Sequence, residues 1–159
     1  MATTLDALKR RDGPALAAVA HPSKGVRFTP YPFVNPARDV VLQRGDLSTA
    51  YTDTRMRTWG ISDGKGDPIT LTFTGYNARF IWSRDFLATS KTAYNKTIGA
   101  GNSMDNTAQV YPKAVLFEAY DAGPDPSMES VQWQSLRLFF EKDGPEWYLV
   151  GVVHGEWTI

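Results

Sequence analysis

The spacing of hydrophobic positions changes along the chain, from helical repeats near its start to alternating runs in its second half. Residues 3–22 carry apolar side chains at helical spacing, interrupted at Asp12 and stopped at Pro22. This pattern predicts two short helices. Asp12 is the predicted cap of the second helix, because an aspartate side chain can accept a hydrogen bond from a free N–H of the first turn.

A longer helix is predicted farther along the chain, over residues 71–82, with Thr72 as its cap. Its apolar face consists of Phe73, Tyr76 and Phe80. These three side chains recur at helical spacing, so the segment is expected to pack on the rest of the molecule through this face.

Two shorter segments lie between these helices. Residues 44–53 predict a short helix capped by Asp46, and residues 25–33 predict a strand. Pro30 and Pro32 confine that strand to the edge of a sheet or bring it to an end, because proline has no N–H for the ladder.

The remaining apolar runs are rich in β-branched and aromatic residues, and glycine- or proline-bearing turns separate most of them. They predict strands over residues 56–61, 86–99, 108–120, 133–142 and 147–159. Helices come first and long strands follow. This order predicts one α+β domain over residues 1–159, with N-terminal helices packed on a strongly curved antiparallel sheet.

Composition limits the function. The chain has 159 residues, 42% of them hydrophobic, which is enough for one packed core. Its 17 basic and 17 acidic residues cancel, so we do not expect nucleic acid or an anionic membrane as a partner. The chain has no cysteine, and its two histidines are far apart in sequence. We therefore expect neither a metal site nor a cofactor.

No apolar run is long enough to predict insertion into a membrane, and the start of the chain lacks the apolar core of a signal peptide. The expected location is cytoplasmic for the chain as it stands, and extracytoplasmic if a leader has been removed from it.

Three blocks carry a resemblance to known proteins: GVRFTPY (25–31), SLRLFFEK (135–142) and WYLVGVVHGEWTI (147–159). They resemble a group of uncharacterised bacterial proteins, many of them exported lipoproteins, although this chain has no cysteine to lipidate. More distantly, the order of elements is similar to that of the NTF2-like (cystatin-like) superfamily, an α+β cone. That superfamily contains enzymes, transport factors and ligand binders, so the resemblance implies a pocket and no particular chemistry.

The last two predicted strands are joined by residues 143–146, which fit a hairpin loop of two or four residues. Both lengths are even and place the same side chains on the same face. The face predicted to pack on the helices carries Gln134, Leu136, Leu138, Phe140, Trp147, Leu149, Gly151, Val153 and Trp157. The face predicted to line a small-molecule pocket carries Trp133, Ser135, Arg137, Phe139, Tyr148, Val150, Val152, His154 and Glu156.

Charged side chains are expected to hold a polar ligand in this pocket. Glu118 is the only charge in the run AVLFEAY (114–120) and can meet Arg137, while Arg27 stands alone among apolar neighbours. A carboxylate beside a guanidinium stays ionised and holds its partner in a forked geometry. The pair fits a ligand site and an internal ion pair equally well.

His154 is the first candidate for proton transfer, because the unperturbed pKa of histidine lies near neutrality. Glu118 is the second candidate. Ligand contact and a purely structural hydrogen bond are the alternatives for His154. Glu156 can orient His154 only if the sheet bends, because residues two apart on one face are about 6–7 Å apart.

Aromatic side chains complete the predicted pocket, although aromatic residues on strands are also common in cores. The expected ligand-binding residues are Arg27, Trp59, Glu118, Trp133, Ser135, Arg137, Tyr148, His154 and Glu156.

Three functions are compatible with this interpretation. The leading one is non-catalytic binding of a small polar or aromatic molecule in a concave pocket. The second is an acid–base enzyme of the isomerase or dehydratase type that uses His154 with Glu118. The third is an interaction module that forms a homodimer through Trp157 and Ile159. The sequence decides neither the ligand nor whether the protein is an enzyme.

Overall fold

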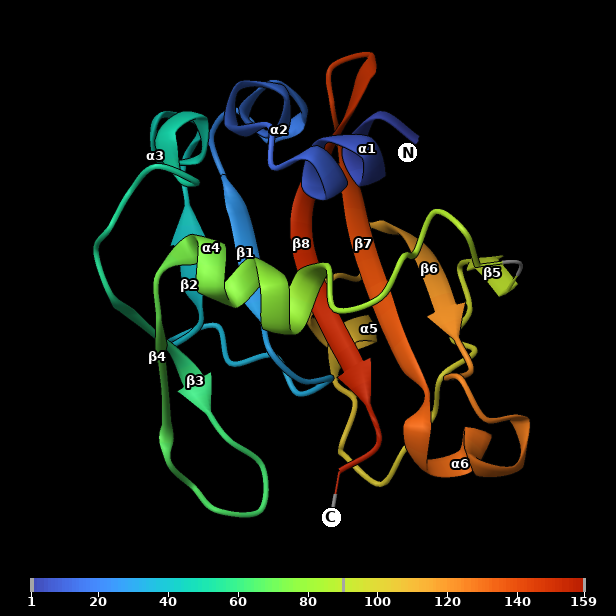
Figure 1. The fold of residues 1–159 in the computed structure, drawn as a ribbon. Helices are drawn as coiled ribbons and strands as arrows, with labels where there is room; N and C mark the ends of the chain where they lie inside the picture. Colours follow the sequence, from blue (N-terminus) through green and yellow to red (C-terminus); the bar gives the residue numbers. More distant parts are fainter. Residues whose placement is uncertain (1, 90, 159) are drawn as a thin grey trace.

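The computed structural model describes residues 2–89 and 91–158. A six-stranded sheet runs through it, and a two-stranded hairpin lies beside the sheet (Figure 1). In spatial order the large sheet consists of β2 (Val40–Leu42), β1 (Val26–Thr29), β8 (Glu146–Glu156), β7 (Gln134–Asp143), β6 (Val115–Asp121) and β5 (Lys91–Tyr94). The hairpin consists of β3 (Arg57–Ile61) and β4 (Pro68–Leu71). Neighbouring strands are antiparallel except β1 and β8, which are parallel.

The helices are short. They are α1 (Ala2–Arg10), α2 (Gly13–Val19), α3 (Arg44–Thr49), α4 (Phe73–Tyr76), the π-helix η1 (Asn77–Ile81), α5 (Thr107–Val110), the 3₁₀ helix η2 (Pro126–Met128) and α6 (Glu129–Gln132). Helices α1, α2 and α4 with η1 lie over one face of the large sheet, and α5 lies behind it (Figure 1). The predicted fold class, α+β with helices on a mainly antiparallel sheet, is confirmed. No helix in the described part of the chain has the length and apolarity that a membrane crossing requires.

Two of the predicted caps are confirmed. The Asp12 carboxylate accepts a hydrogen bond from the Ala15 N–H at 2.9 Å, and the Thr72 hydroxyl accepts one from the Gly75 N–H at 3.1 Å. The prediction for Asp46 is wrong in position. The N-cap of α3 is Gln43, and Asp46 accepts the Gln43 N–H at 3.2 Å from the third helical position.

Several elements differ from the prediction. Of the described residues in the run 86–99, only those of β5 form a strand, and the run 108–120 begins within helix α5 before it becomes β6. Strands β2 and β4 were not predicted. Each of them is only three or four residues long, so its pairing with a neighbour decides its conformation more than its own pattern does.

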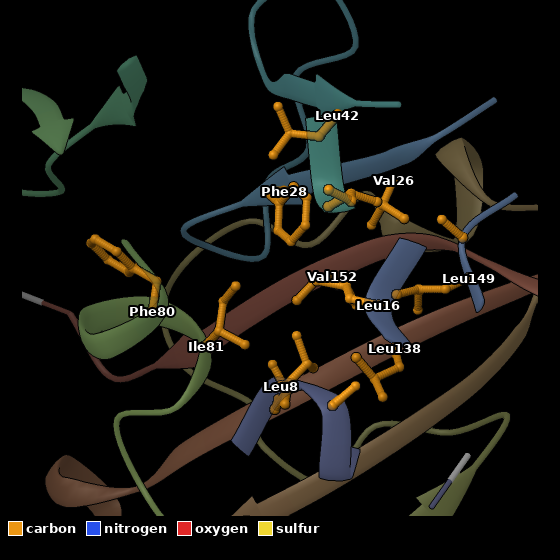
Figure 2. Packing of buried hydrophobic residues seen from close by; sticks show 14 of the residues in the cluster. Leu8, Leu16, Val26, Phe28, Leu42, Phe80, Ile81, Leu138, Leu149 and Val152 are labelled. Atoms are coloured by element: carbon orange, nitrogen blue, oxygen red, sulfur yellow. The ribbon is translucent and has the colours of Figure 1, made fainter. Parts of the chain in front are cut away.

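The main core lies between the helices and the sheet. Figure 2 shows Leu8 of α1 and Leu16 of α2 over Leu138, Leu149 and Val152 of the central strands. Leu8, Leu16 and Leu138 are fully buried. Truncating any one of them to alanine is expected to cost about 2–5 kcal/mol, because the lost contacts leave a cavity.

A smaller core lies on the opposite face of the sheet. It contains Val34 of the β1–β2 connection, Tyr111 at the end of α5, and three residues of β7 and β8, Phe139, Val150 and Val153. Tyr111 stacks on Phe139 with ring centroids 4.4 Å apart. Both faces of the central strands are therefore covered, one by helices and the other by long connections.

A β-bulge divides the β7–β8 pair. The turn itself is even, as predicted, because Asp143 pairs with Glu146. Beyond it Phe140 pairs with Leu149, but Phe139 pairs with Gly151, so Val150 is an extra residue on β8. One extra residue places every later side chain of β8 on the side opposite to the one that it would have in a regular strand without a bulge.

The predicted facing of His154 is therefore wrong. His154 pairs with Leu136 and Val152 pairs with Leu138, so both lie on the side covered by helices, which we call the helix face. Arg137 and Val153 pair on the opposite side, which we call the loop face. His154 and Arg137 cannot line one pocket because they project from opposite faces of the sheet.

Candidate functional site

The structure contains a surface cleft, cleft A, which adjoins the end of β1 and the β3–β4 turn. Its volume is about 580 Å³, within the range of about 300–1,000 Å³ that is usual for small-molecule sites. Its walls are two connections, residues 30–39 and 102–104, and the end of β3 with the turn that follows it, residues 60–63. The lining residues are Pro30, Tyr31, Phe33, Asn35, Arg38, Asp39, Gly60, Ile61, Ser62, Asp63, Asn102, Ser103 and Met104.

Apolar side chains on the three walls of cleft A face solvent. Phe33 is 48% exposed, Ile61 52% and Met104 72%. Exposed apolar groups that converge on one hollow are typical of an interaction site, whereas scattered single ones are not. Cleft A therefore has the apolar component of a small-molecule site.

Hydrogen bonds hold the first wall of cleft A in shape. β1 ends at Thr29, directly before Pro30, and the chain turns back through residues 35–39. The Asp39 carboxylate accepts hydrogen bonds from the Thr29 hydroxyl at 2.8 Å and the Asn35 N–H at 2.9 Å through one oxygen, Oδ2. Burial raises the pKa of Asp39, and these two hydrogen bonds act in the opposite direction.

The other two walls of cleft A are joined to each other. The Ser103 hydroxyl lies 3.3 Å from the Asp63 carboxylate and 2.9 Å from the Thr158 hydroxyl. The Thr158 hydroxyl donates in turn to the Asn102 side-chain oxygen at 3.2 Å. A segment between β5 and α5, the β3–β4 turn and the end of the chain thus meet through polar side chains.

A second cleft, cleft B, opens on the loop face and has a volume of about 520 Å³. Its floor includes the stacked pair Tyr111 and Phe139. The Asp105 carboxylate and Thr107 also line it, and the Asp105 side chain is 35% exposed.

The predicted pair of Glu118 and Arg137 is formed, and it is internal. Arg137 Nε lies 3.0 Å from Glu118 Oε1, and both side chains are almost completely buried. Arg137 also donates to the Asp105 carboxylate and to the Gly99 carbonyl, each at 2.6 Å. The Glu118 carboxylate accepts hydrogen bonds from the backbone N–H groups of Ile98 and Gly99. Glu118, one of the two candidate catalytic residues, is thus part of a closed structural network.

This network anchors residues 99–105, a segment that contributes lining residues to both clefts. Arg137 holds both Gly99 and Asp105, which lie on either side of the cleft A residues 102–104. Burial opposes the ionisation of Asp105, but hydrogen bonds from Thr107 and the charge of Arg137 outweigh it and lower the pKa of Asp105. Asp105 therefore stays ionised and keeps its hold on Arg137.

His154 lies beneath η1 and is fully buried. Its ring meets the Phe80 ring edge to face at 5.7 Å. Nε2 is 3.3 Å from a Glu156 oxygen, yet neither ring nitrogen has a hydrogen-bond partner within residues 2–89 and 91–158. Burial lowers the pKa of His154, and the Glu156 carboxylate only partly offsets this effect. The imidazole is therefore neutral at neutral pH.

Glu156 lies beside His154 on the helix face. Its carboxylate accepts two hydrogen bonds from the Arg79 guanidinium, at 2.7 and 3.2 Å. Burial alone would raise the pKa of Glu156, but interactions with His154 and Arg79 lower it to about 2. Arg79 also lies over the Phe80 ring, and Tyr31 of cleft A meets that ring from another side at 5.9 Å.

The aromatic residues expected in the pocket are core or surface groups. Trp59 is fully buried, stacks on Tyr76 at 4.1 Å and donates its indole N–H to the Leu71 carbonyl at 2.9 Å. Trp133 is buried against Tyr120.

Three more of the expected ligand-binding residues lie in other parts of the structure. Tyr148 is half-buried under the Arg44 guanidinium and meets the His21 ring. Ser135 is buried on the loop face, and Arg27 donates to the Pro36 carbonyl at 3.1 Å.

None of the nine predicted ligand-binding residues lines cleft A or cleft B. The sequence analysis missed the residues of cleft A because its walls come mostly from connections between elements. One signal was available: the run from Tyr31 to Asp39 places two aromatic, one amide and two charged side chains around Pro32 and Pro36, where no strand can continue.

No group of three or more histidine, cysteine, aspartate or glutamate residues within the described ranges could hold a metal ion. The expected contact of a homodimer involved Trp157, which is 37% exposed, and Ile159, which lies outside the described residues.

No protein-family model matches this chain, and no curated protein matches it. Among solved structures it is similar to a DUF4783 family protein from Bacteroides ovatus, with 8% sequence identity and a TM-score of 0.44. That similarity covers 100% of this chain and 96% of the other. It is also similar to a protein of the NTF2-like family from Streptomyces avermitilis, with 12% identity and a TM-score of 0.40, over 99% of this chain and 92% of that one.

The second of these structures comes from the superfamily that the order of elements resembles. Because both TM-scores are below 0.5, neither similarity carries an argument about activity or ligand. The α+β assignment rests on the strand order and the helical layer of the molecule itself.

Proposed function

We propose that the protein binds a small polar or partly aromatic molecule in cleft A without catalysing a reaction on it. The observation that carries this proposal is the convergence of exposed apolar side chains with polar ones in a cleft of about 580 Å³. Mixed linings of this kind provide affinity through apolar contact and orientation through a few hydrogen bonds.

Acid–base catalysis by His154 with Glu118 is not favoured by this geometry. Both side chains are fully buried and project from opposite faces of the sheet, and neither lines cleft A or cleft B. A general base must reach the proton that it removes, directly or through one water molecule.

Binding is tested by thermal unfolding in the presence of a library of neutral, acidic and basic metabolites. A ligand that binds only the folded state at about 100 times its Kd stabilises that state by about 2.7 kcal/mol. We expect at least one compound to raise the Tm of the wild-type protein and to raise that of Phe33→Ala much less.

Trp147→Ala is the matched control for Phe33→Ala. Trp147 is 49% exposed, almost the same fraction as Phe33, but it lies near the tip of the β7–β8 hairpin and lines neither cleft. A compound that stabilises wild type, Phe33→Ala and Trp147→Ala equally binds elsewhere. If all active compounds behave in this way, or if none is active, cleft A is not the binding site.

A further inference from the structure

We propose that the ligand of cleft A is a neutral polyhydroxylated molecule, such as a sugar. This inference rests on the proposed function and names its ligand class. It follows from three features of the lining: its charges, its available hydrogen-bonding groups and its apolar surface.

The charges that line cleft A have both signs. Arg38 stands on the same wall as Asp39, and Asp63 lies on a second wall. An anionic ligand would meet two carboxylates, and a cationic ligand would meet the guanidinium. A neutral ligand avoids both repulsions, and its hydroxyl groups can use charged side chains of either sign as hydrogen-bond partners.

The polar side chains of cleft A offer both donors and acceptors. Asn35 and Asn102 use their side-chain oxygens internally, for the Ala37 N–H and the Thr158 hydroxyl. Within the part of the chain that the structure describes, this leaves their NH₂ groups as the donors that they present.

Asp39 provides the matching acceptor. Its Oδ2 atom holds the turn through Thr29 and Asn35, and its Oδ1 atom accepts no hydrogen bond from residues 2–89 or 91–158, so it is available as an acceptor. A hydroxyl group donates one hydrogen bond and accepts others, so it can bridge a carboxylate oxygen and an amide N–H. A carboxylate or a simple aromatic ring cannot do both.

The apolar surface of cleft A fits the carbon skeleton of such a ligand. Phe33 presents nearly half of its surface to solvent, and Ile61 lies on the second wall. The C–H groups on one side of a sugar ring form an apolar patch that can pack on an aromatic face, whose π-system is electron-rich. Hydroxyl groups at the rim of the ring then point toward the polar walls.

The test uses isothermal titration of the full chain with glucose, N-acetylglucosamine and maltose, and with benzoate and benzylamine as charged aromatic probes. Each titration is made at about 0.05 M and about 0.5 M salt, because salt screens exposed charges. We expect one or more of the sugars to bind, with an affinity that changes less than about twofold between the two salt concentrations.

Three variants locate the contact. Phe33→Ala is expected to weaken sugar binding about tenfold, since about 1.4 kcal/mol of apolar contact corresponds to that factor. Arg38→Gln is expected to weaken it by no more than about fivefold, the effect of one hydrogen bond. Trp147→Ala should leave it unchanged. If Phe33→Ala has a lowered Tm without ligand, Ile61→Ala tests the second wall in its place.

The two proposals fail in different ways. Salt-sensitive binding of benzoate or benzylamine that Phe33→Ala weakens, without binding of any sugar, would overturn the sugar inference and support cleft A as a binding site. Sugar binding that is equal in the wild type, Phe33→Ala and Ile61→Ala would overturn the assignment to cleft A. The absence of binding by all five probes would overturn the sugar inference, and the metabolite library would then decide the proposed function.

Discussion

Two ionic clusters lie on opposite faces of the same pair of strands, and they are built differently. On the loop face, Arg137 is enclosed by Glu118, Asp105 and a backbone carbonyl. On the helix face, Glu156 is shared by Arg79 and His154, and the histidine nitrogens make no hydrogen bond with the described residues.

The two clusters differ in how completely hydrogen bonds replace the water that their buried groups have lost. A buried charge is tolerated when several hydrogen bonds replace its water, and Arg137 has them. A buried imidazole without hydrogen bonds costs stability, and protonation would add a buried charge to that cost. We therefore expect the two faces to respond differently to mutation and to pH.

The largest expected effect is that of Arg137→Met. This change leaves Glu118 as a buried carboxylate without its counter-charge, and we expect a loss of about 3–5 kcal/mol in the free energy of unfolding. Urea denaturation at neutral pH measures it. The exposed pair of Lys9 and Asp85 is the control, since Lys9→Ala should cost less than about 1 kcal/mol.

The double variant Arg137→Met/Glu118→Gln sharpens this result. It removes both charges of the buried pair and should recover part of the loss, because no buried carboxylate is left unpaired at position 118. A loss of less than about 1 kcal/mol in the single variant would contradict the view that the loop-face cluster is a structural network.

A smaller effect is expected for Glu156→Gln on the helix face. The change removes the charge that Arg79 pairs with, but the Arg79 side chain is 48% exposed and can turn to water. We expect a loss of about 1–2 kcal/mol, less than for Arg137→Met, in the same urea experiment. Equal losses in the two variants would contradict the expectation that the loop-face cluster contributes more to stability than the helix-face cluster.

The smallest expected effect is a pH dependence that belongs to His154. Its pKa in the folded state is lowered by burial, while an unfolded histidine titrates near pH 6.5. Below about pH 6.5 the unfolded chain therefore binds more protons than the folded chain at this site, and stability falls as the pH falls. The slope from one group is at most about 1.4 kcal/mol for each pH unit.

The variant His154→Leu isolates the contribution of His154 to the pH dependence of stability. Leucine has no proton to gain, so the stability of the variant should fall less steeply between pH 7 and pH 5, a window that spans the titration of an unfolded histidine at about pH 6.5. Parallel stability curves for the wild type and His154→Leu would contradict the expected titration.

Local features of the fold could be predicted from the sequence because they depend on neighbouring residues. The caps Asp12 and Thr72 act within three positions of their partners. The pairing of Glu118 with Arg137 needed only two neighbouring strands that each carry a charge of opposite sign in an apolar stretch.

The facing of His154 depended on one residue that the alternating pattern does not reveal. Val150 is apolar and buried in either register, so the hydrophobic pattern alone gives no sign of the bulge. Gly151 was the available signal, because glycine inside a strand often marks a bulge or a close backbone approach. A Cβ atom at Gly151 would lie 2.6 Å from the Tyr111 hydroxyl oxygen.

Cleft A could not be predicted because its walls lie far apart in the sequence. The turn at residues 35–39 and the polar contacts of Ser103 depend on connections whose positions follow from the sheet. Their own residues are typical of surface loops, and only the packing of the sheet brings them together.

The bulge at Val150 also affects how related chains should be compared. Loss of the one residue between Leu149 and Gly151 would remove the bulge but leave Gly151 opposite Phe139 and His154 opposite Leu136, so the C-terminal half of β8 would keep its facing and His154 its place beneath η1. Two homologues that differ by one residue at this point would therefore place equivalent amino acids in the same environment, although their residue numbers beyond it differ by one. An alignment of such homologues should match β8 residues by the side of the sheet that they occupy, and accept a gap in the strand itself.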